Sequence, residues 1–158
     1  MKKKTILATL VVAMLTISPA MATKIKPMKE FVDELMAKMT LQEKIGQLNL
    51  MVAGDITTGG ALNTQVGGDI AAGNMGGVFN IKGIDKIKAL QDIAIKKSRL
   101  GIPLLVGMDV IHGYETMFPI PLALSCSWDT EAMKQVGAVS AKEATADGIN
   151  WTFSPMVD

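Results

Sequence analysis

The sequence predicts an α/β fold built around a parallel sheet. Apolar segments of strand length alternate along the chain with segments in which apolar side chains recur at helical spacing, and glycine or proline residues separate the two kinds of segment. Because a strand, helix, strand order needs crossover connections, it is typical of parallel sheets. Connections of this length build either an open doubly wound sheet or a (β/α)8 barrel.

The first expected elements are two helices and a strand. The first helix covers residues 31–39, whose apolar side chains recur at a helical period: Phe31, Val32, Leu35, Met36 and Met39. The second begins after Thr40, because Thr40 and Glu43 have the spacing of a capping box, in which each side chain accepts a hydrogen bond from the other residue's backbone N–H. Residues 45–51, which include Ile45, Leu48, Leu50 and Met51, are then a candidate first strand.

A segment rich in glycine and threonine, residues 54–77, favours a loop with a short helix. It contains neither G-x-G-x-x-G nor G-x-x-x-x-G-K-[ST], so it gives no support for a nucleotide site. Residues 76–81, which open on two glycines and continue with apolar side chains, predict the second strand.

A further helix is expected after the second strand, where apolar residues recur at helical spacing: Ile84, Ile87, Leu90 and Ala94. Gly101, in a left-handed conformation, and Pro103 are expected to end it. Residues 104–106 are apolar without alternation, which predicts a third strand covered on both faces.

The last predicted pair of elements is a helix and a strand. Asp129 is expected to cap a helix that ends at Gly148, and residues 149–157 predict the fourth strand. Three or four strands are too few to close a barrel. Since the last apolar segment runs to Asp158 without a helix to cover it, we expect the chain to be the first part of a larger fold.

The N-terminal residues predict a secretory signal. Three lysines, at positions 2–4, precede an apolar run at residues 6–17, and residues 20–22 provide small side chains two positions apart. The run is shorter than the roughly 20 residues that span a bilayer, which favours a cleaved signal over an uncleaved membrane anchor. We therefore expect residues 1–22 to be a signal peptide and residues 23–158 to form the mature, periplasmic or secreted portion, free of the membrane after cleavage.

Composition excludes some functions. The 158 residues carry a formal net charge of +1, and removal of the three N-terminal lysines leaves 13 basic against 15 acidic residues, or −2. This balance lacks the excess of basic residues that is typical of nucleic-acid-binding proteins. Cys126 is the single cysteine, so the chain can form neither an internal disulfide nor a thiolate metal cluster, and we expect Cys126 to be a small buried side chain. No cofactor is indicated.

Two acids follow predicted strands, where ligands bind in parallel α/β folds. Asp109 follows the third strand and Asp158 the fourth. Two such carboxylates could accept hydrogen bonds from adjacent sugar hydroxyls, hold a metal, or act as an acid and a base. No histidine or acid stands at ligand spacing around them, so a metal site is disfavoured. The alternative for each is a structural role, which for Asp109 would be an ion pair or a helix cap.

The segment after Asp109 holds other candidates. His112, the only histidine, could be a general base, but we favour a role in fixing the loop through hydrogen bonds of its ring nitrogens. Trp128 could stack on a sugar, but just before a helix cap it is more often a packing anchor. The sequence does not set the direction of Glu115.

Four segments carry a family resemblance: "MTLQEKIGQLNL", "GNMGGVFNIKG", "KKSRLGIPLLVGMDVIHGYETMFPIPLALSCSWD" and "GINWTFSPMVD". In this order they resemble the opening blocks of glycoside hydrolase family 3, of the periplasmic β-glucosidase type, over residues 39–158. The resemblance implies a partial (β/α)8 TIM-like barrel, of which this chain supplies the first three to four β/α units. It also implies, as partners, the remainder of the barrel and a second domain, an α/β sandwich. The implied activity is retaining hydrolysis of terminal β-glucosyl residues from β-glucosides and oligosaccharides.

The resemblance also assigns residues. Asp109 matches a carboxylate that hydrogen-bonds hydroxyls of the glucosyl unit, and His112 and Gly113 belong to the same motif and shape its turn. Asp158 matches an acidic position at the next strand end. The family's nucleophilic aspartate and acid/base glutamate fall beyond this sequence, so no catalytic residue is assigned here. A noncatalytic sugar-binding module and an inactive fragment are the alternatives.

Overall fold

The computed structural model describes residues 26–53 and 65–156, which fall into two units, Met1–Ala37 and Lys38–Asp158. The predicted signal peptide lies outside the described residues. In the first unit the expected helix is present as α1, Met28–Lys38. Within the described ranges, no helix combines the length and apolar character needed to cross a bilayer.

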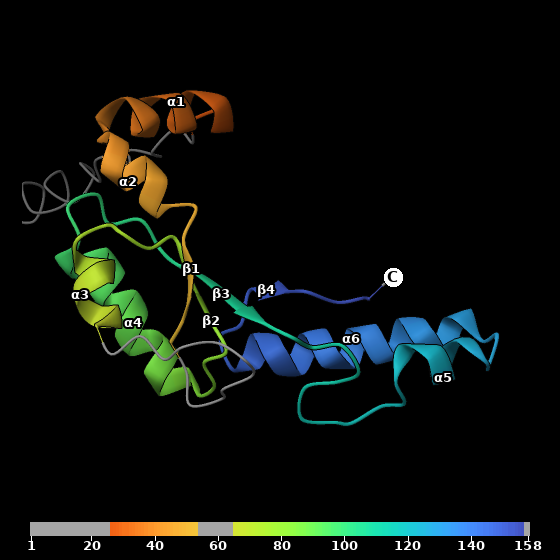
Figure 1. Ribbon diagram of the computed structural model, residues 1–158. Coiled ribbons are helices and arrows are strands. Elements are labelled where there is room, and N and C mark those ends of the chain that lie inside the picture. The colour runs from red at the N-terminus through yellow and green to blue at the C-terminus, as the bar shows by residue number, and fades with distance from the viewer. Residues whose placement is uncertain (1–25, 54–64, 157–158) are drawn as a thin grey trace, which may run out of the picture. The chain divides into compact units, whose positions relative to one another are not determined.

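The second unit contains a parallel sheet whose strands follow one another in chain order (Figure 1). The strands are β1 (Leu50–Val52), β2 (Gly77–Phe79), β3 (Leu105–Met108) and β4 (Trp151–Thr152), and every neighbouring pair is parallel. An order that never reverses is that of a (β/α)8 barrel, because a doubly wound sheet reverses at its switch point. The predicted fold class, α/β with part of a TIM-like barrel, is confirmed.

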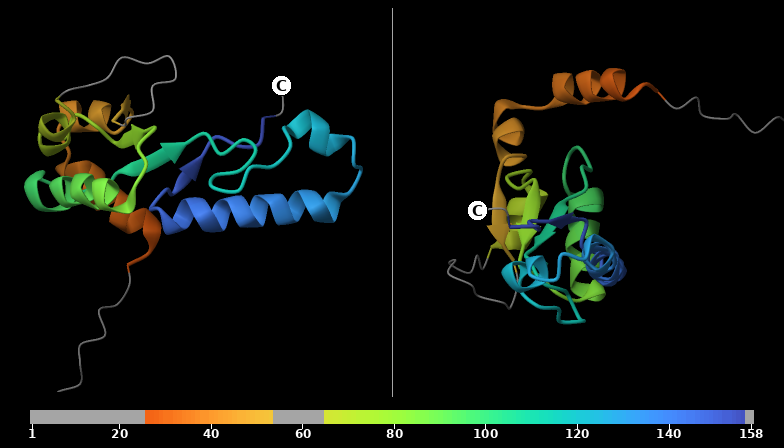
Figure 2. Two further views of the ribbon diagram at one scale, coloured as in Figure 1. Left: turned by 90° about the horizontal axis from the view of Figure 1, so that it is seen from below. Right: turned by 90° about the vertical axis from the view of Figure 1, so that its right-hand side faces the viewer.

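Helix α2 (Leu41–Gly46) precedes β1, and further helices connect the strands. These are α3 (Val66–Ala71), α4 (Ile84–Lys97), α5 (Pro121–Ser125) and α6 (Thr130–Ala146), of which α3, α4 and α6 contribute to the core on one side of the sheet. Figure 2 shows α4 and α6 along the same side of the strands. The core lies between them, where Val78 and Val106 of the strands meet Ile87 of α4 and Ala144 of α6.

The other side of the sheet is open in the described part of the chain. Side chains alternate along a strand, so Leu105 and Gly107 point away from the helices that cover Val106. Leu105 is 50% exposed, and the prediction that this strand is covered on both faces is wrong for the part of the fold described. We call this side, formed by alternate residues of the four strands, the open face.

Aromatic rings gather on the open face. The rings of Phe79 and Phe153 meet edge to face at 5.3 Å, and the ring of Trp151 lies 4.8 Å from that of Phe153. A Cβ atom at Gly107 would lie 3.1 Å from two atoms of the Phe153 ring. Glycine at this position therefore lets the ring lie flat against β3 beside its carboxyl end.

The predicted helix signals are largely confirmed. The capping box of α2 is complete, with Glu43 N–H donating to Thr40 Oγ1 at 3.2 Å and Thr40 N–H donating to Glu43 Oε2 at 2.8 Å. Asp129 caps α6 by accepting from Ala132 N–H at 2.9 Å. The helix ends at Ala146, close to the predicted end at Gly148, which has a positive φ of 92°. Gly101 is left-handed, as predicted, but α4 ends earlier, at Lys97.

Other boundaries differ from the prediction. The predicted strand at residues 45–51 is wrong in its first half, because α2 runs through Gly46 and β1 starts only at Leu50. The fourth strand is shorter than residues 149–157 and is confined to β4. Helix α5 was not predicted, because its few residues are too short to show a period.

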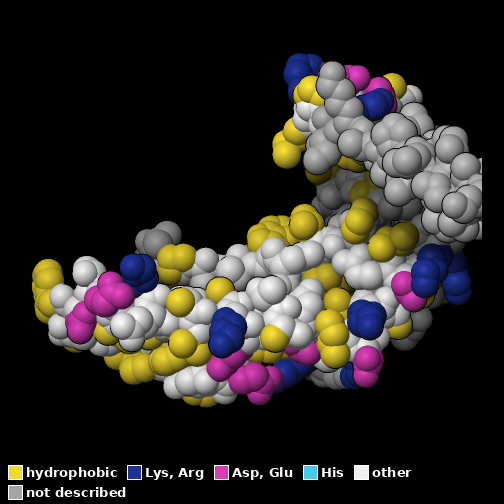
Figure 3. Space-filling model, turned by 180° about the vertical axis from the view of Figure 1, so that it is seen from behind, with side chains coloured by type: hydrophobic (Ala, Val, Ile, Leu, Met, Phe, Trp, Pro, Cys, Tyr) yellow, Lys and Arg dark blue, Asp and Glu magenta, His cyan; other side chains and the backbone are white. Residues whose placement is uncertain are grey.

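Two predicted burials are wrong in the described structure. Cys126 is exposed, and Trp128 is 91% exposed with a left-handed backbone rather than a packing anchor. Both follow α5, a segment with several exposed apolar side chains. Figure 3, which views the molecule from behind, shows hydrophobic side chains interspersed with charged ones over the part that contains α5 and α6.

The capping box makes a pH-dependent prediction. Arg99 donates to both carboxylate oxygens of Glu43, at 2.9 and 2.5 Å, and these bonds, with the Thr40 backbone bond, lower the pKa of Glu43 from 4.5 to about 2. A lowered pKa in the folded state means that the stabilisation is complete above about pH 4.5 and is lost as pH falls towards 2. Hydrogen exchange of the α2 amides should therefore lose about tenfold in protection across this window.

Glu43→Gln is the comparison for this experiment, because it removes the titrating group. Its α2 protection should be low and should change little between those pH values. Asp92→Asn, which removes an exposed carboxylate paired with Lys96 on α4, should behave like the wild type. The same pH dependence in wild type and Glu43→Gln would show that Glu43 is not the group responsible.

Candidate active-site edge of the sheet

The candidate site lies at the carboxyl end of β3. Asp109 directly follows Met108, the last residue of β3, and alternation places it on the same side as Leu105 and Gly107, which is the open face. Asp109 is exposed, and among the described residues no group forms a hydrogen bond or ion pair with it. An ion pair or helix cap for Asp109 is therefore not found in the described structure, and both carboxylate oxygens are free to accept hydrogen bonds.

The loop after Asp109, residues 110–118, is closed on itself. Val110 is buried in the core, and Phe118 N–H donates to the His112 carbonyl oxygen at 2.8 Å. Gly113 has a φ of 116°, and a Cβ atom there would overlap the carbonyl oxygen of Thr116. Only glycine fits this turn, because both the backbone angle and the space exclude a side chain.

His112 contributes to this turn through its backbone. Its ring Nδ1 is buried and has no hydrogen-bond partner in the described part of the chain. The expected fixing of the loop by ring hydrogen bonds is therefore not seen at Nδ1, and the carbonyl oxygen closes the loop instead.

Two carboxylates of α6 hold the middle of the loop. Glu143 accepts from the backbone N–H groups of Glu115 and Thr116, at 3.0 and 2.9 Å, and from the Thr116 hydroxyl at 2.6 Å. Asp147, one turn later, accepts from the Tyr114 hydroxyl and, at 2.9 Å, from Gly83 N–H at the start of α4. The loop is thus joined to both α6 and α4.

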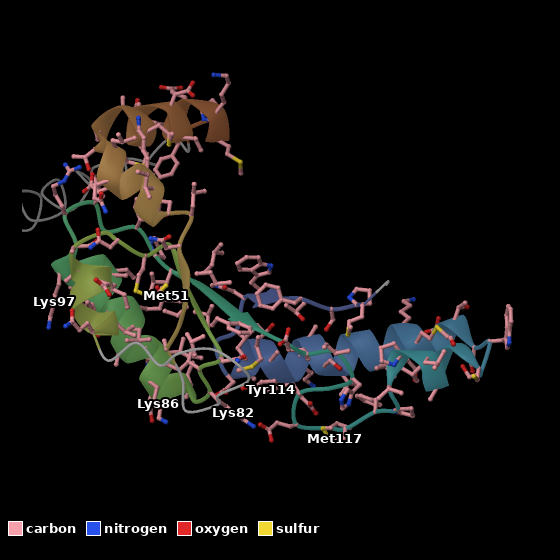
Figure 4. The ribbon with its side chains drawn as sticks, viewed as in Figure 1. Met51, Lys82, Lys86, Lys97, Tyr114 and Met117 are labelled. Atoms are coloured by element: carbon pink, nitrogen blue, oxygen red, sulfur yellow. The ribbon has the colours of Figure 1, made fainter. Side chains whose placement is uncertain are left out.

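Lys82 completes this group of side chains. Its Nζ forms an ion pair with Glu115 at 2.5 Å and lies 5.0 Å from the centre of the Tyr114 ring (Figure 4). Glu115, whose direction the sequence left open, therefore points to Lys82. Figure 4 places Lys82 and Tyr114 side by side, with Met117 farther along the same loop.

These bonds fix the charges of the group. The hydroxyl of Thr116 is the main cause of a lowered pKa for Glu143, and the hydroxyl of Tyr114 is the main cause of a lowered pKa for Asp147. Burial, followed by the bond to Asp147, raises the pKa of Tyr114. Both carboxyls are therefore ionised and Tyr114 is neutral near neutral pH, the state in which all the described bonds form.

Sequence reasoning missed Glu143 and Asp147, although a signal was available. Acids at the C-terminal end of a helix are disfavoured by the helix dipole, and α6 has no basic residue in its last turn. Two acids one turn apart at the C-terminal end of a helix indicate that hydrogen-bond donors or basic groups elsewhere in the chain offset the unfavourable interaction with the helix dipole.

A large hollow of about 710 Å³ lies among α5, α6 and the segment around β4. Apolar side chains such as Leu124, Met133 and Val136 line it, and neither Asp109 nor any other carboxylate does. Its acceptor side chains, such as Ser140 and Asn150, are uncharged, so it lacks the carboxylate that the sequence predicts for the sugar site. Within residues 26–53 and 65–156, no three side chains among His, Cys, Asp and Glu are grouped to hold a metal ion. Asp158, the second sequence-predicted site residue, lies outside the described residues.

Known proteins are similar to this chain in sequence. Residues 40–158 match the family described as the glycosyl hydrolase family 3 N terminal domain. The chain is 44% identical over 128 residues to the periplasmic beta-glucosidase of Salmonella typhimurium, covering 81% of this chain and 16% of that protein. It is 30% identical over 154 residues to the lysosomal beta glucosidase of Dictyostelium discoideum, covering 80% of this chain and 18% of the relative.

Solved structures that are similar to this chain are also named as beta-glucosidases. The beta-glucosidase from Listeria innocua in complex with isofagomine matches with a TM-score of 0.70 and 42% identity, over 82% of this chain and 18% of that one. A beta-glucosidase involved in saponin metabolism from intestinal bacteria matches with a TM-score of 0.63 and 28% identity, over 83% and 16%. The chain spans less than a fifth of the length of each of these proteins.

The turn geometry predicts that Gly113→Ala displaces the loop after Asp109. The substitution should destabilise the protein by about 2 to 4 kcal/mol, because it combines backbone strain with an overlap. Gly68→Ala, in α3 with no neighbour near its Cβ, is the matched control and should change stability by less than about 1 kcal/mol. Thermal unfolding of the two variants measures the difference, and equal melting temperatures would contradict this account of the turn.

Proposed function

We propose that this chain, which belongs to the glycosyl hydrolase family 3 N-terminal domain family, builds the first strands of a β-glucosidase barrel and supplies part of its glucose-binding subsite. The complete enzyme would hydrolyse terminal, non-reducing β-D-glucosyl residues from β-glucosides and oligosaccharides. The relatives named above as beta-glucosidases support this activity.

One observation carries the assignment of the subsite. Asp109 stands at the carboxyl end of β3, on the open face, exposed and without a partner among the described residues. An ionised carboxylate there can accept two hydrogen bonds at once, which matches two adjacent sugar hydroxyls. The aromatic rings of Phe79, Trp151 and Phe153 share this face and provide an apolar floor near it.

Asp109 binds rather than reacts in this proposal. Retaining hydrolysis needs two carboxyl groups roughly 5 to 5.5 Å apart, one as nucleophile and one as acid and base. Among the described residues, no second carboxylate interacts with Asp109. The resemblance assigns both reacting carboxyl groups to positions beyond this sequence. Asp158, which follows the fourth strand in sequence, is proposed as a second sugar contact.

The proposed setting is an exported enzyme. Residues 1–22 would direct export, and residues 23–158 would begin the barrel domain in the periplasm or outside the cell. The remainder of the barrel and an α/β sandwich domain would complete the protein and cover the open face. The relative named as periplasmic supports this location.

Asp109→Ala in the complete protein tests the proposal. The loss of two charged hydrogen bonds, each contributing about 1.5 to 3 kcal/mol, should lower kcat/KM for an aryl β-glucoside by about 100-fold or more. Asp92→Ala, an exposed carboxylate on α4, is the control and should leave kcat/KM unchanged.

Three outcomes separate the candidate functions. Unchanged kinetics in Asp109→Ala would remove Asp109 from the glucose subsite. Glucose binding by the wild-type protein without any turnover would support the noncatalytic sugar-binding module instead. Binding and turnover both absent from a folded wild-type protein would support an inactive relic.

A further inference from the structure

We propose that Glu143 and Asp147 of α6 are positioning residues, which set the direction of Asp109 by clamping the loop that follows it. The proposal deepens the proposed function, because it rests on Asp109 as a sugar contact. Neither residue reaches the open face, so neither is expected to touch the substrate.

Asp109 depends on its backbone for its direction. Its own side chain has no bond within the described chain, so nothing else there holds the carboxylate in one place. On one side its backbone continues β3, and on the other side Val110 is buried in the core. Beyond Val110 the chain enters the turn that closes at Phe118, and in this proposal the path of the turn sets how the backbone leaves Asp109.

Glu143 removes that freedom at the exposed tip. It collects three hydrogen bonds from two consecutive residues, Glu115 and Thr116, so both oxygens of the carboxylate are used. Apart from the ion pair of Glu115 with Lys82, the tip packs loosely, as the large exposed fraction of Met117 shows. The Glu143 bonds are therefore the main attachment of the tip to a helix.

Asp147 holds the base of the loop in the same way. One of its oxygens accepts from both the Tyr114 hydroxyl and Gly83 N–H, so it fixes the loop relative to the start of α4. Lys82, the residue before Gly83, adds its ion pair to Glu115. The loop after β3 is thus tied to the connection that leaves β2, the neighbouring strand.

The placement of these acids argues for a role beyond helix stability. Glu143 lies in the last turn of α6 and Asp147 follows it, where the helix dipole opposes negative charge. Their hydrogen bonds to the loop offset this cost. The same bonds fix the path of the loop that follows Asp109.

The test uses the complete protein and its kcat/KM for an aryl β-glucoside. Glu143→Gln leaves one oxygen for the two loop N–H donors, presents an NH2 group to the Thr116 hydroxyl in place of an acceptor, and removes the charge that strengthens all three bonds, so kcat/KM should fall about tenfold. Glu131→Gln, in the first turn of the same helix with a single long contact to Lys134, is the matched control and should stay within twofold of the wild type.

A double-mutant cycle separates positioning from general damage. If Glu143 acts through Asp109, Glu143→Gln should cause less than a twofold further loss in an Asp109→Ala background. A full tenfold loss in that background, or no loss in the single variant, would overturn the proposal. Thr116→Val removes only one exposed donor to Glu143 and serves as the test if Glu143→Gln does not fold. Its loss of kcat/KM should be smaller than tenfold, and it should disappear in the Asp109→Ala background.

Asp147 is tested by conservative rescue. Asp147→Asn keeps an oxygen that can accept from Tyr114 and Gly83 and should retain most of kcat/KM, whereas Asp147→Ala should lose about tenfold. Equal losses in both variants would contradict the positioning role. Normal kinetics in Asp109→Ala alone would instead refute the sugar contact, while a damaged Asp109→Ala with a normal Glu143→Gln would refute only this inference.

Discussion

The parallel pairing of β1 to β4 in chain order is the constraint on which the rest of this structure depends. Each strand must be reached by a connection that returns across the sheet, and the helices of these connections occupy one side. Val78 and Val106 then face the helices, and the residues on either side of each valine in its strand face away. Because the period is two, the position of Val106 alone decides that Asp109 belongs to the open face.

Local signals were predicted well from the sequence, and signals that depend on distant parts of the chain were not. The Thr40 and Glu43 capping box, the Asp129 cap and the left-handed Gly101 each rest on residues a few positions apart. The start of β1 was misplaced because the alternation of apolar and polar side chains at residues 45–51 continues from α2 without a break, and so short a pattern does not distinguish the end of a helix from a strand. The exposures of Leu105, Cys126 and Trp128 depend on what covers them, which their neighbours in sequence do not specify.

The candidate site divides in the same way. Asp109 could be predicted because strand ends are where ligands bind in parallel folds. The clamp around its loop could not, since Thr116 and Glu143 lie 27 positions apart and no sequence pattern links them. What the sequence does contain is an electrostatic anomaly, two acids at the wrong end of a helix. Such anomalies are worth searching for, because they point to partners that periodicity cannot reveal.

The chain-order sheet also bears on how the protein can assemble. Each strand pairs with the strand made just before it, so every pairing can form as soon as its second partner has left the ribosome or a secretion channel. The paired residues are 27 (Leu50 and Gly77) to 44 (Gly107 and Trp151) positions apart, and pairing over such separations is slow. The rings on the open face gain nothing from these pairings, however. In the complete enzyme proposed above, Trp151 and Phe153 would stay partly in water until the remaining strands covered them, and a nascent chain would be most prone to aggregate in that interval.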